Sequence, residues 1–231
     1  MQKYSIFSLI KNALNNHKNW EVAWKDPEPK EQYDAVIIGG GGHGLATAYY
    51  LAKEHNITKV AVLEKGWIGG GNVGRNTTIL RSNYMWDANG LFYEQGMKLW
   101  ENLSQELNFN VMYSPRGIIN LAHSDAQLNV YNRRGNSMRL NGIDAVMLNR
   151  EEIKKMIPFA DFSESARFPI FGALMQPRGG TARHDAVAWG YARGADDMGV
   201  DIIQNCEVNG IKRNANGVEG IETTKGFIKT K

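Results

Sequence analysis

Residues 35–48 read AVIIGGGGHGLATA, and this stretch decides the fold class of the chain. Its first four residues form a short apolar run, typical of a buried strand, which the following glycines interrupt. Apolar residues then recur at helical spacing up to His55, and a second apolar run, residues 60–63, ends at Glu64. The order strand, glycine turn, helix, strand predicts a βαβ unit with a parallel strand pair, the helix following a central strand.

The glycine turn has the spacing of a dinucleotide-binding site. Gly39, Gly41 and Gly44 satisfy the pattern G-x-G-x-x-G between the expected strand and the expected helix. Gly39 allows a tight turn, Gly41 lets the backbone approach a diphosphate, and Gly44 lets the helix pack closely on the strand. Gly42 and His43 lie in the same turn, where a helix N-terminus directs free N–H groups at phosphate oxygens. A purely structural glycine turn is the alternative.

Glu64 lies twenty positions beyond Gly44, where a carboxylate accepts hydrogen bonds from a ribose hydroxyl. The same negative charge would repel a 2′-phosphate, so the pattern disfavours an NADP-type cofactor. These residues alone leave FAD and NAD open. We expect His43 in the first helical turn, packing near the cofactor, with a role as catalytic base as the alternative.

The composition is that of an ordinary globular protein. The chain has 231 residues, of which 42% are hydrophobic and 22% charged, and its formal net charge is +3. So small a charge, with no block of basic residues, gives nucleic-acid binding little support. A single cysteine, Cys206, excludes an internal disulfide framework and leaves a zinc site without a second thiolate. No long apolar run and no secretory pattern is present, so we expect a soluble, cytoplasmic protein.

The chain divides into four segments by sequence texture. Residues 1–31 form an N-terminal arm, in which residues 6–14 follow helical spacing and a Pro-containing linker follows. This helix either packs on its own domain or belongs to an arm that docks on a partner subunit. Residues 32–84 are expected to begin a nucleotide-binding domain, residues 85–180 to begin a substrate domain, and residues 181–231 to continue the nucleotide-binding domain.

Hydrophobic periodicity predicts the other elements. The helical pattern occurs in four stretches: a helix ending near Leu107, residues 126–139, a short helix capped by Asn149, and a helix from about residue 181 to Met198. Apolar runs predict strands over residues 117–122, 172–175 and 201–208, and a hairpin over residues 218–223 and 226–229. Cys206 would lie in the middle of its strand as a small buried group. Because the chain stops directly after the hairpin, we expect a domain truncated at its C-terminus.

The residues after Glu64 resemble a known family. Residues 64–84, EKGWIGGGNVGRNTTILRSNY, are closely similar to the flavin loop of the sarcosine oxidase β subunits of heterotetrameric bacterial enzymes. The likeness extends back through residues 36–53 and forward into residues 199–208. It implies the α/β fold of the DAO family of FAD-dependent amine oxidoreductases. In that fold a Rossmann-like parallel sheet of the glutathione-reductase type is combined with an interleaved α+β substrate domain.

The resemblance also implies which residues contact cofactors and substrate. FAD would be held non-covalently by the glycine turn and by Glu64, Lys65, Asn72, Arg75, Asn76, Thr77, Thr78 and Val208. Arg81 would bind the substrate carboxylate, because a planar guanidinium matches two carboxylate oxygens; a structural ion pair or a flavin-phosphate contact is the alternative. His184 matches the histidine that carries covalent FMN in this family, with Arg183 suited to the FMN phosphate. Without the resemblance, His184 would be interpreted as a capping or surface histidine.

By the same resemblance, the activity is the oxidation of sarcosine, bound as the neutral amine, to glycine and a one-carbon unit. Electrons would pass from FAD to FMN and then to oxygen, giving hydrogen peroxide. The expected partners are other sarcosine oxidase subunits, including a folate- and NAD-binding chain, because no folate site is visible here. The alternatives are a related FAD-dependent dehydrogenase of dimethylglycine, glycine or D-amino acids, and a truncated non-catalytic flavin-binding module. The 231-residue chain alone is expected to be inactive.

Overall fold

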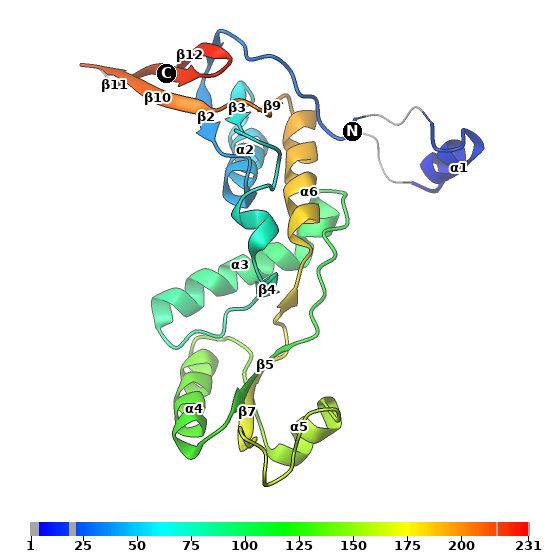
Figure 1. Cartoon of the computed structure of the whole chain (residues 1–231), viewed down its shortest axis with the longest axis vertical. Coiled ribbons are helices and arrows are strands. Elements are labelled where there is room, and N and C mark those ends of the chain that lie inside the picture. The colour runs from blue at the N-terminus through cyan, green and yellow to red at the C-terminus, as the bar shows by residue number, and fades with distance from the viewer. Residues whose placement is uncertain (1–4, 19–21, 216, 231) are drawn as a thin grey trace. The chain divides into compact units, whose positions relative to one another are not determined.

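The computed structural model of the chain describes residues 5–18, 22–215 and 217–230 (Figure 1). These residues form two compact units. Unit 1 comprises Met1–Thr77, Ser104–Val111 and Arg183–Lys231, and unit 2 comprises Thr78–Leu103 and Met112–Ala182. The segment expected to begin a substrate domain, residues 85–180, therefore includes a short piece, residues 104–111, that belongs to unit 1.

Unit 1 is built around a parallel sheet in the order β2-β3-β9. Its strands are β2 (Ala35–Ile38), β3 (Val60–Leu63) and β9 (Asp201–Ile203), and α2 (Gly42–His55) connects the first two. The predicted βαβ unit is confirmed. The expectation that the helix follows a central strand is wrong for the described residues, because α2 follows β2, an outer strand. β3 takes the centre since all four of its residues are buried and it pairs on both sides.

A second helix packs beside α2 in unit 1. Helix α6 (His184–Asp197) precedes β9, as the sequence predicts, and the structure shows that it contacts α2. The two backbones approach closely, since a Cβ built on Gly194 would lie 2.9 Å from the ring of Tyr49. Burial, followed by the nearby Glu106 carboxylate, raises the pKa of Tyr49 to about 12. Glu106, in the short piece of unit 1 at the end of α3 (Asp87–Glu106), pairs with Lys53 of α2 at 2.8 Å.

A second sheet of unit 1 has the order β1-β12-β11-β10. Its strands are β1 (Gln32–Tyr33), β10 (Val208–Asn214), β11 (Gly217–Thr223) and β12 (Gly226–Thr230). The predicted hairpin is confirmed, because β11 and β12 are antiparallel neighbours. One hydrophobic cluster contains residues of both sheets: Tyr33, Ala61, Leu63, Ile203, Cys206, Ile221 and Ile228. This cluster fixes the second sheet to the parallel one.

The expected strand over residues 201–208 is wrong as a single element. β9 ends at Ile203, and the chain turns before β10 begins in the other sheet. Asn205 has a left-handed φ of +51°, which ends the extended backbone, and the N–H of Cys206 donates to the Glu64 carbonyl at 2.9 Å. Cys206 therefore lies between two strands instead of within one. Its predicted burial is confirmed, because it is 1% exposed.

Unit 2 contains the antiparallel sheet β5-β7-β6 and a two-stranded sheet, β4-β8. Their bounds are β4 (Ile79–Leu80), β5 (Ile118–Ala122), β6 (Val146–Leu148), β7 (Gly172–Gln176) and β8 (Gly180–Thr181). Helices α4 (Asp125–Leu140) and α5 (Arg150–Met156) pack on β7, and most of α3 belongs to the same unit. The predicted cap of α5 is confirmed as a capping box between Asn149 and Glu152. The sequence analysis missed β4, β6 and β8, which are too short to show a period.

The N-terminal arm contains the predicted helix, α1 (Ile6–Leu14). No residue of α1 is buried in the described part of the chain. Both alternatives for the arm, packing on its own domain and docking on a partner subunit, stay predictions. Residues 1–4 and 19–21 of the arm, and Lys231, lie outside the described part of the chain. No described helix is both long and apolar enough to cross a lipid bilayer.

Candidate dinucleotide site

The glycine turn between β2 and α2 has a geometry that only glycine allows at two of its positions. Gly39 has a φ of +106°, and its N–H donates to the Leu63 carbonyl at 2.8 Å, which holds the turn on β3. A Cβ built on Gly44 would lie 2.1 Å from the Gly39 carbonyl oxygen and 3.2 Å from Cγ2 of Ile37. The first turn of α2 therefore packs directly against the end of β2, as the spacing of the glycines predicts.

The N-terminus of α2 is shaped to receive an anion. Gly41 is the N-cap and makes no side-chain hydrogen bond to the first-turn N–H groups. Those N–H groups therefore remain available as donors to a ligand, and the helix dipole adds partial positive charge. A Cβ on Gly41 or Gly42 would have only Cγ2 of Val73 nearby, at 3.6 Å, so the backbone stays open to close approach. His43 is in the first turn, as predicted, and is exposed.

The Glu64 carboxylate lies on the same glycine turn. Its Oε2 accepts the N–H of Gly40 at 2.8 Å, and its Oε1 accepts the N–H of Gly66 at 2.9 Å. These two bonds fix the carboxylate at the carboxyl end of β3, beside the open N-terminus of α2. Each oxygen keeps a further lone pair, so the group can still accept a ribose hydroxyl.

The loop after Glu64 folds back over the glycine turn. The N–H of Gly69 donates to the Gly40 carbonyl at 3.1 Å, and a short 3-10 helix, η1 (Asn72–Arg75), follows. Val73 of this helix faces Gly41. Four side chains predicted to contact the cofactor are exposed on unit 1 near this turn: Lys65, Asn72, Arg75 and Asn76. Lys65 and Arg75 make no ion pair with any described residue, so their positive charges remain available to an anionic ligand.

The remaining predicted cofactor residues are more scattered. Thr77 is exposed and ends the first segment of unit 1, whereas Thr78, with a φ of +61°, begins unit 2. Val208 is half-buried at the start of β10 and packs on the cluster that joins the two sheets. The structure gives Val208 a packing role, and its contact with a cofactor stays a prediction.

Helix α6 brings His184 into unit 1 next to the loop of η1. Ala188 of α6 lies 3.6 Å from a Cβ built on Gly69, so the first turns of α6 contact this loop. His184 is the first residue of α6, as predicted, and its buried Nδ1 has no hydrogen-bond partner among the described residues. Arg183 is the N-cap and donates from Nε to Asp185 at 2.8 Å. Although burial opposes it, this bond helps to hold the pKa of Asp185 below its usual range.

Arg81 belongs to unit 2, where it is part of a polar relay that the sequence analysis missed. Its guanidinium stacks on the ring of Tyr84 at 4.8 Å and donates from Nη1 to Oδ1 of Asn83 at 2.6 Å. The fully buried Asn83 donates to Oδ1 of Asn120 at 2.7 Å, and Arg134 donates to the same oxygen at 2.9 Å. Two guanidinium groups therefore meet at one pair of amide side chains.

Neither cation of this relay has a carboxylate partner within the described residues, so the structural ion pair considered for Arg81 is not seen there. Burial lowers the pKa of Arg134, and the positive charge of Arg81 lowers it further. The Nε of Arg134 is buried and makes no hydrogen bond to a described residue. Two neighbouring cations without a counter-ion favour the binding of a small carboxylate. Arg134 is one polar residue within an ordinary helical pattern, and no signal in the sequence distinguishes it.

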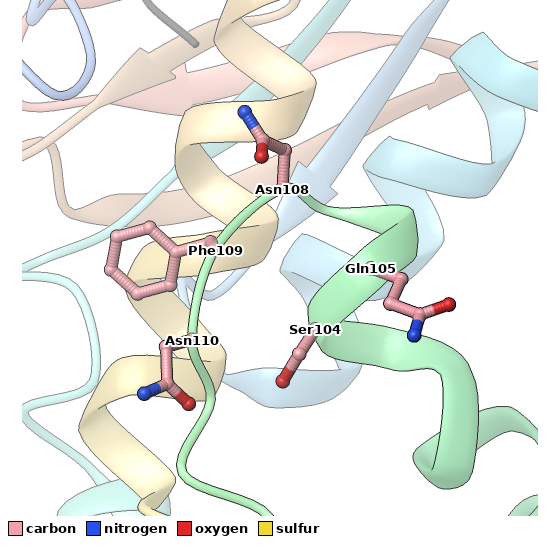
Figure 2. A pocket seen from close by; sticks show the side chains of 5 residues that line it. All are labelled: Ser104, Gln105, Asn108, Phe109 and Asn110. Atoms are coloured by element: carbon pink, nitrogen blue, oxygen red, sulfur yellow. The ribbon is translucent and has the colours of Figure 1, made fainter. Parts of the chain in front are cut away.

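A cavity of about 500 Å³ lies at the end of α3 in unit 1. Figure 2 shows the side chains that line it: Ser104, Gln105, Asn108, Phe109 and Asn110. None of these side chains is charged, and none titrates in the range used for acid–base catalysis. The sequence predicted none of them as a site residue, and the glycine turn remains the candidate functional site.

The parallel sheet, the glycine turn and the acid at the end of the second strand define a dinucleotide-binding protein of the Rossmann class. Comparison with known proteins narrows this class. Residues 34–231 match the model of the FAD dependent oxidoreductase family, DAO, and the chain belongs to this family. Its fold is thus the FAD-binding α/β fold that the sequence predicts.

Individual relatives agree with this assignment. Sarcosine oxidase subunit beta of Rhizobium meliloti (strain 1021) is 64% identical over 226 residues, 98% of this chain and 54% of the relative. The protein of the same name from Rhodobacter capsulatus is 50% identical over 228 residues, 99% of this chain and 55% of the relative. The crystal structure of L-proline dehydrogenase from P. horikoshii superposes with a TM-score of 0.79 at 28% identity, covering 87% of this chain and 52% of that one. The chain thus spans about half the length of the relatives it matches.

FAD fits the site that the residues form. The close packing at Gly44, the uncapped N–H groups of α2 and the fixed carboxylate of Glu64 together provide a diphosphate site beside a ribose acceptor. The family assignment resolves the choice between FAD and NAD that the glycine pattern left open.

Proposed function

We propose that the protein is the FAD-binding subunit of a multi-subunit oxidase that converts sarcosine to glycine and a one-carbon unit, with formation of hydrogen peroxide. The 64% identity to a sarcosine oxidase subunit beta over nearly the whole of this chain carries the proposal. The other subunits, including a folate- and NAD-binding chain, are proposed as partners because the matched relatives are named as subunits.

In this proposal unit 1 holds FAD, which when bound accepts two electrons from the amine substrate. The N–H groups of α2 bind the diphosphate, and Glu64 accepts a ribose hydroxyl while Gly40 and Gly66 hold its carboxylate in place. The exposed cations Lys65 and Arg75 supply charge for the phosphates. Asn72, Asn76, Thr77, Thr78 and Val208 are proposed as further FAD contacts.

Arg81 is proposed to bind the substrate carboxylate. The stacking on Tyr84 and the bond to the buried Asn83 restrict its guanidinium to one orientation, while its other N–H groups remain available to two carboxylate oxygens. Such a cation favours an amino acid over an amine that lacks a carboxylate. The substrate amine must be bound neutral, because an ammonium group has no lone pair to assist oxidation.

His184 is proposed to carry FMN covalently, with Arg183 at the FMN phosphate. The fit rests on the buried Nδ1 of His184, which has no partner among the described residues, and on the exposed Arg183 at the N-terminus of α6. A neutral imidazole nitrogen is a competent nucleophile for such a linkage. FMN, when bound, would pass electrons on to oxygen.

The proposal is tested on the full-length subunit assembled with its partners, by measuring hydrogen peroxide formed from sarcosine, dimethylglycine, glycine and D-alanine. We expect sarcosine to give the highest kcat/KM. Arg81→Met should raise the KM for sarcosine at least tenfold, since a charge-assisted bidentate pair contributes roughly 1.5–3 kcal/mol. Phe159→Ser, which changes an exposed ring of unit 2, serves as the control and should leave the KM unchanged. An assembly that forms peroxide from another amine but not from sarcosine would disprove the substrate assignment.

A further inference from the structure

Helix α1 (Ile6–Leu14) exposes an entire apolar face. Ile6, Phe7, Leu9, Ile10 and Leu14 are 66%, 79%, 63%, 52% and 80% exposed. At the helical period these positions, with Ala13, cover one continuous arc of roughly 160°. Single exposed apolar side chains are common on protein surfaces, but a contiguous face of this kind marks an interaction site.

The other face of α1 is polar and carries only positive charge. Ser8, Lys11, Asn12 and Asn15 lie on it, and Ser5 caps the helix by accepting the N–H of Ser8 at 3.2 Å. Residues 1–18 contain three lysines and no Asp or Glu. The helix is therefore a short, basic, amphipathic element with its own N-cap. Its exposed apolar face would be stabilised by contact with another apolar surface.

The segment that follows the helix is fixed to unit 1. The N–H of Lys25 donates to Asp196 at 2.9 Å, and Asp26 accepts the N–H of Gln204 at 2.8 Å. Further along, Lys30 pairs with Asp201 at 2.7 Å. The C-terminal part of the arm is therefore bonded to unit 1, whereas none of the side chains of α1 is buried.

The comparisons separate the arm from the family fold. The FAD dependent oxidoreductase model begins at residue 34, so the fold common to the family does not include the arm. In contrast, the matches to two of the three relatives named subunit beta cover 98% and 99% of this chain, so fewer residues lie outside them than the arm contains. The match to the third covers 90% of this chain. The arm thus accompanies relatives whose names describe them as parts of a larger assembly.

We propose that α1 docks its apolar face into an apolar groove on another subunit of the same enzyme, whose rim carries carboxylates that pair with Lys11 and Lys18. This inference rests on the proposed multi-subunit function. It goes beyond that function because it assigns the assembly contact to a single helix outside the flavin fold. Helix-in-groove docking of this kind uses anchors at positions i, i+3, i+4 and i+7. Ile6, Leu9, Ile10 and Ala13 have this spacing, and Phe7, Ile10 and Leu14 provide i, i+3 and i+7 on the same face.

The test uses the full-length subunit, co-produced with an affinity-tagged partner subunit. The variant Phe7→Ala/Ile10→Ala removes two anchors, and Asn12→Ala/Asn15→Ala changes the polar face of the same helix. The substitutions of Phe7, Ile10 and Asn12 raise helix propensity, and Asn15 is the C-cap just beyond the last helical residue, so neither variant is expected to lose contacts by unfolding α1. We expect the first variant to reduce recovery with the tagged partner at least tenfold and the second to assemble like the wild type. Lys11→Glu/Lys18→Glu should weaken assembly less, and the loss should depend on salt.

Three outcomes would overturn the proposal. The first is normal assembly of Phe7→Ala/Ile10→Ala, and the second is a lower thermal midpoint or FAD content of this variant as an isolated subunit, which would show that α1 packs on its own chain. The third is wild-type binding to vesicles containing phosphatidylserine combined with normal assembly of the variant, which would assign the helix to a membrane surface. Sarcosine oxidation by the wild-type assembly is measured separately, so that its failure would refute the proposed function without deciding the docking contact.

Discussion

Replacing Gly44 by alanine is expected to damage both the fold and the cofactor site of this protein. The new Cβ would lie 2.1 Å from the Gly39 carbonyl oxygen. Because carbon and oxygen atoms in contact are normally about 3.3 Å apart, the N-terminus of α2 and the end of β2 would have to separate by roughly 1.2 Å. Both groups are backbone, so no side-chain rotation relieves the overlap.

Overpacking of this kind typically costs about 1–3 kcal/mol. If about 2 kcal/mol of it is lost from FAD binding, the Kd rises roughly 30-fold. FAD titration of the apo form of the full-length subunit, followed by quenching of flavin fluorescence, measures this change. A thermal melt of the apo protein should show a lower midpoint.

Two other glycines provide matched controls for this experiment. A Cβ on Gly96, inside α3, meets no atom within 4 Å, so Gly96→Ala should leave the Kd unchanged and stabilise the helix by up to about 1 kcal/mol. Gly41→Ala meets only Val73 at 3.6 Å, so the apo protein should keep its thermal midpoint while FAD binding weakens. If Gly44→Ala binds FAD like the wild type and melts at the same temperature, the close-packing argument is wrong.

Three further changes test other parts of the structure. In Glu64→Gln the side-chain amide nitrogen is a donor, so it cannot accept the N–H of Gly40 or Gly66, and one of these two N–H groups loses its partner. The altered position of this side chain should raise the Kd for FAD roughly tenfold in the same titration. An unchanged Kd would remove Glu64 from the site. Acid precipitation of the full-length wild type should leave yellow flavin in the pellet, and His184→Ala should release it; fully extractable wild-type flavin would contradict the covalent linkage. The buried Cys206 thiol should react with a thiol reagent only when the protein unfolds, so rapid labelling of the native protein would contradict its burial.

Local patterns predicted the elements whose formation depends on neighbouring residues. The βαβ unit follows from an apolar run, a glycine spacing and a helical period, which together span residues 35–63, and all of its bounds were close to those observed. Asn149 was predicted as the N-cap of α5, and the structure adds its reciprocal partner, Glu152, three residues on. Glu64 was recognised for the same reason, since the strand places its carboxylate at a fixed point beside the glycine turn.

Contacts between distant residues decided what the patterns could not. The apolar run at residues 201–208 is divided between two sheets, because Cys206 bonds to the backbone of Glu64 while Val208 packs on the shared core. The relay from Arg81 through Asn83 and Asn120 to Arg134 joins four positions from three separate stretches. Nothing in the sequence around any one of them indicates the others.

The sequence by itself determined the dinucleotide-binding class of this protein, because a glycine spacing and an acid after the second strand act through backbone geometry within one short segment. Only the tertiary structure decided which strand is central, where Cys206 lies and which cations meet without a counter-ion. These properties depend on which surfaces are removed from water when distant segments pack together, and a linear pattern contains no information on that choice.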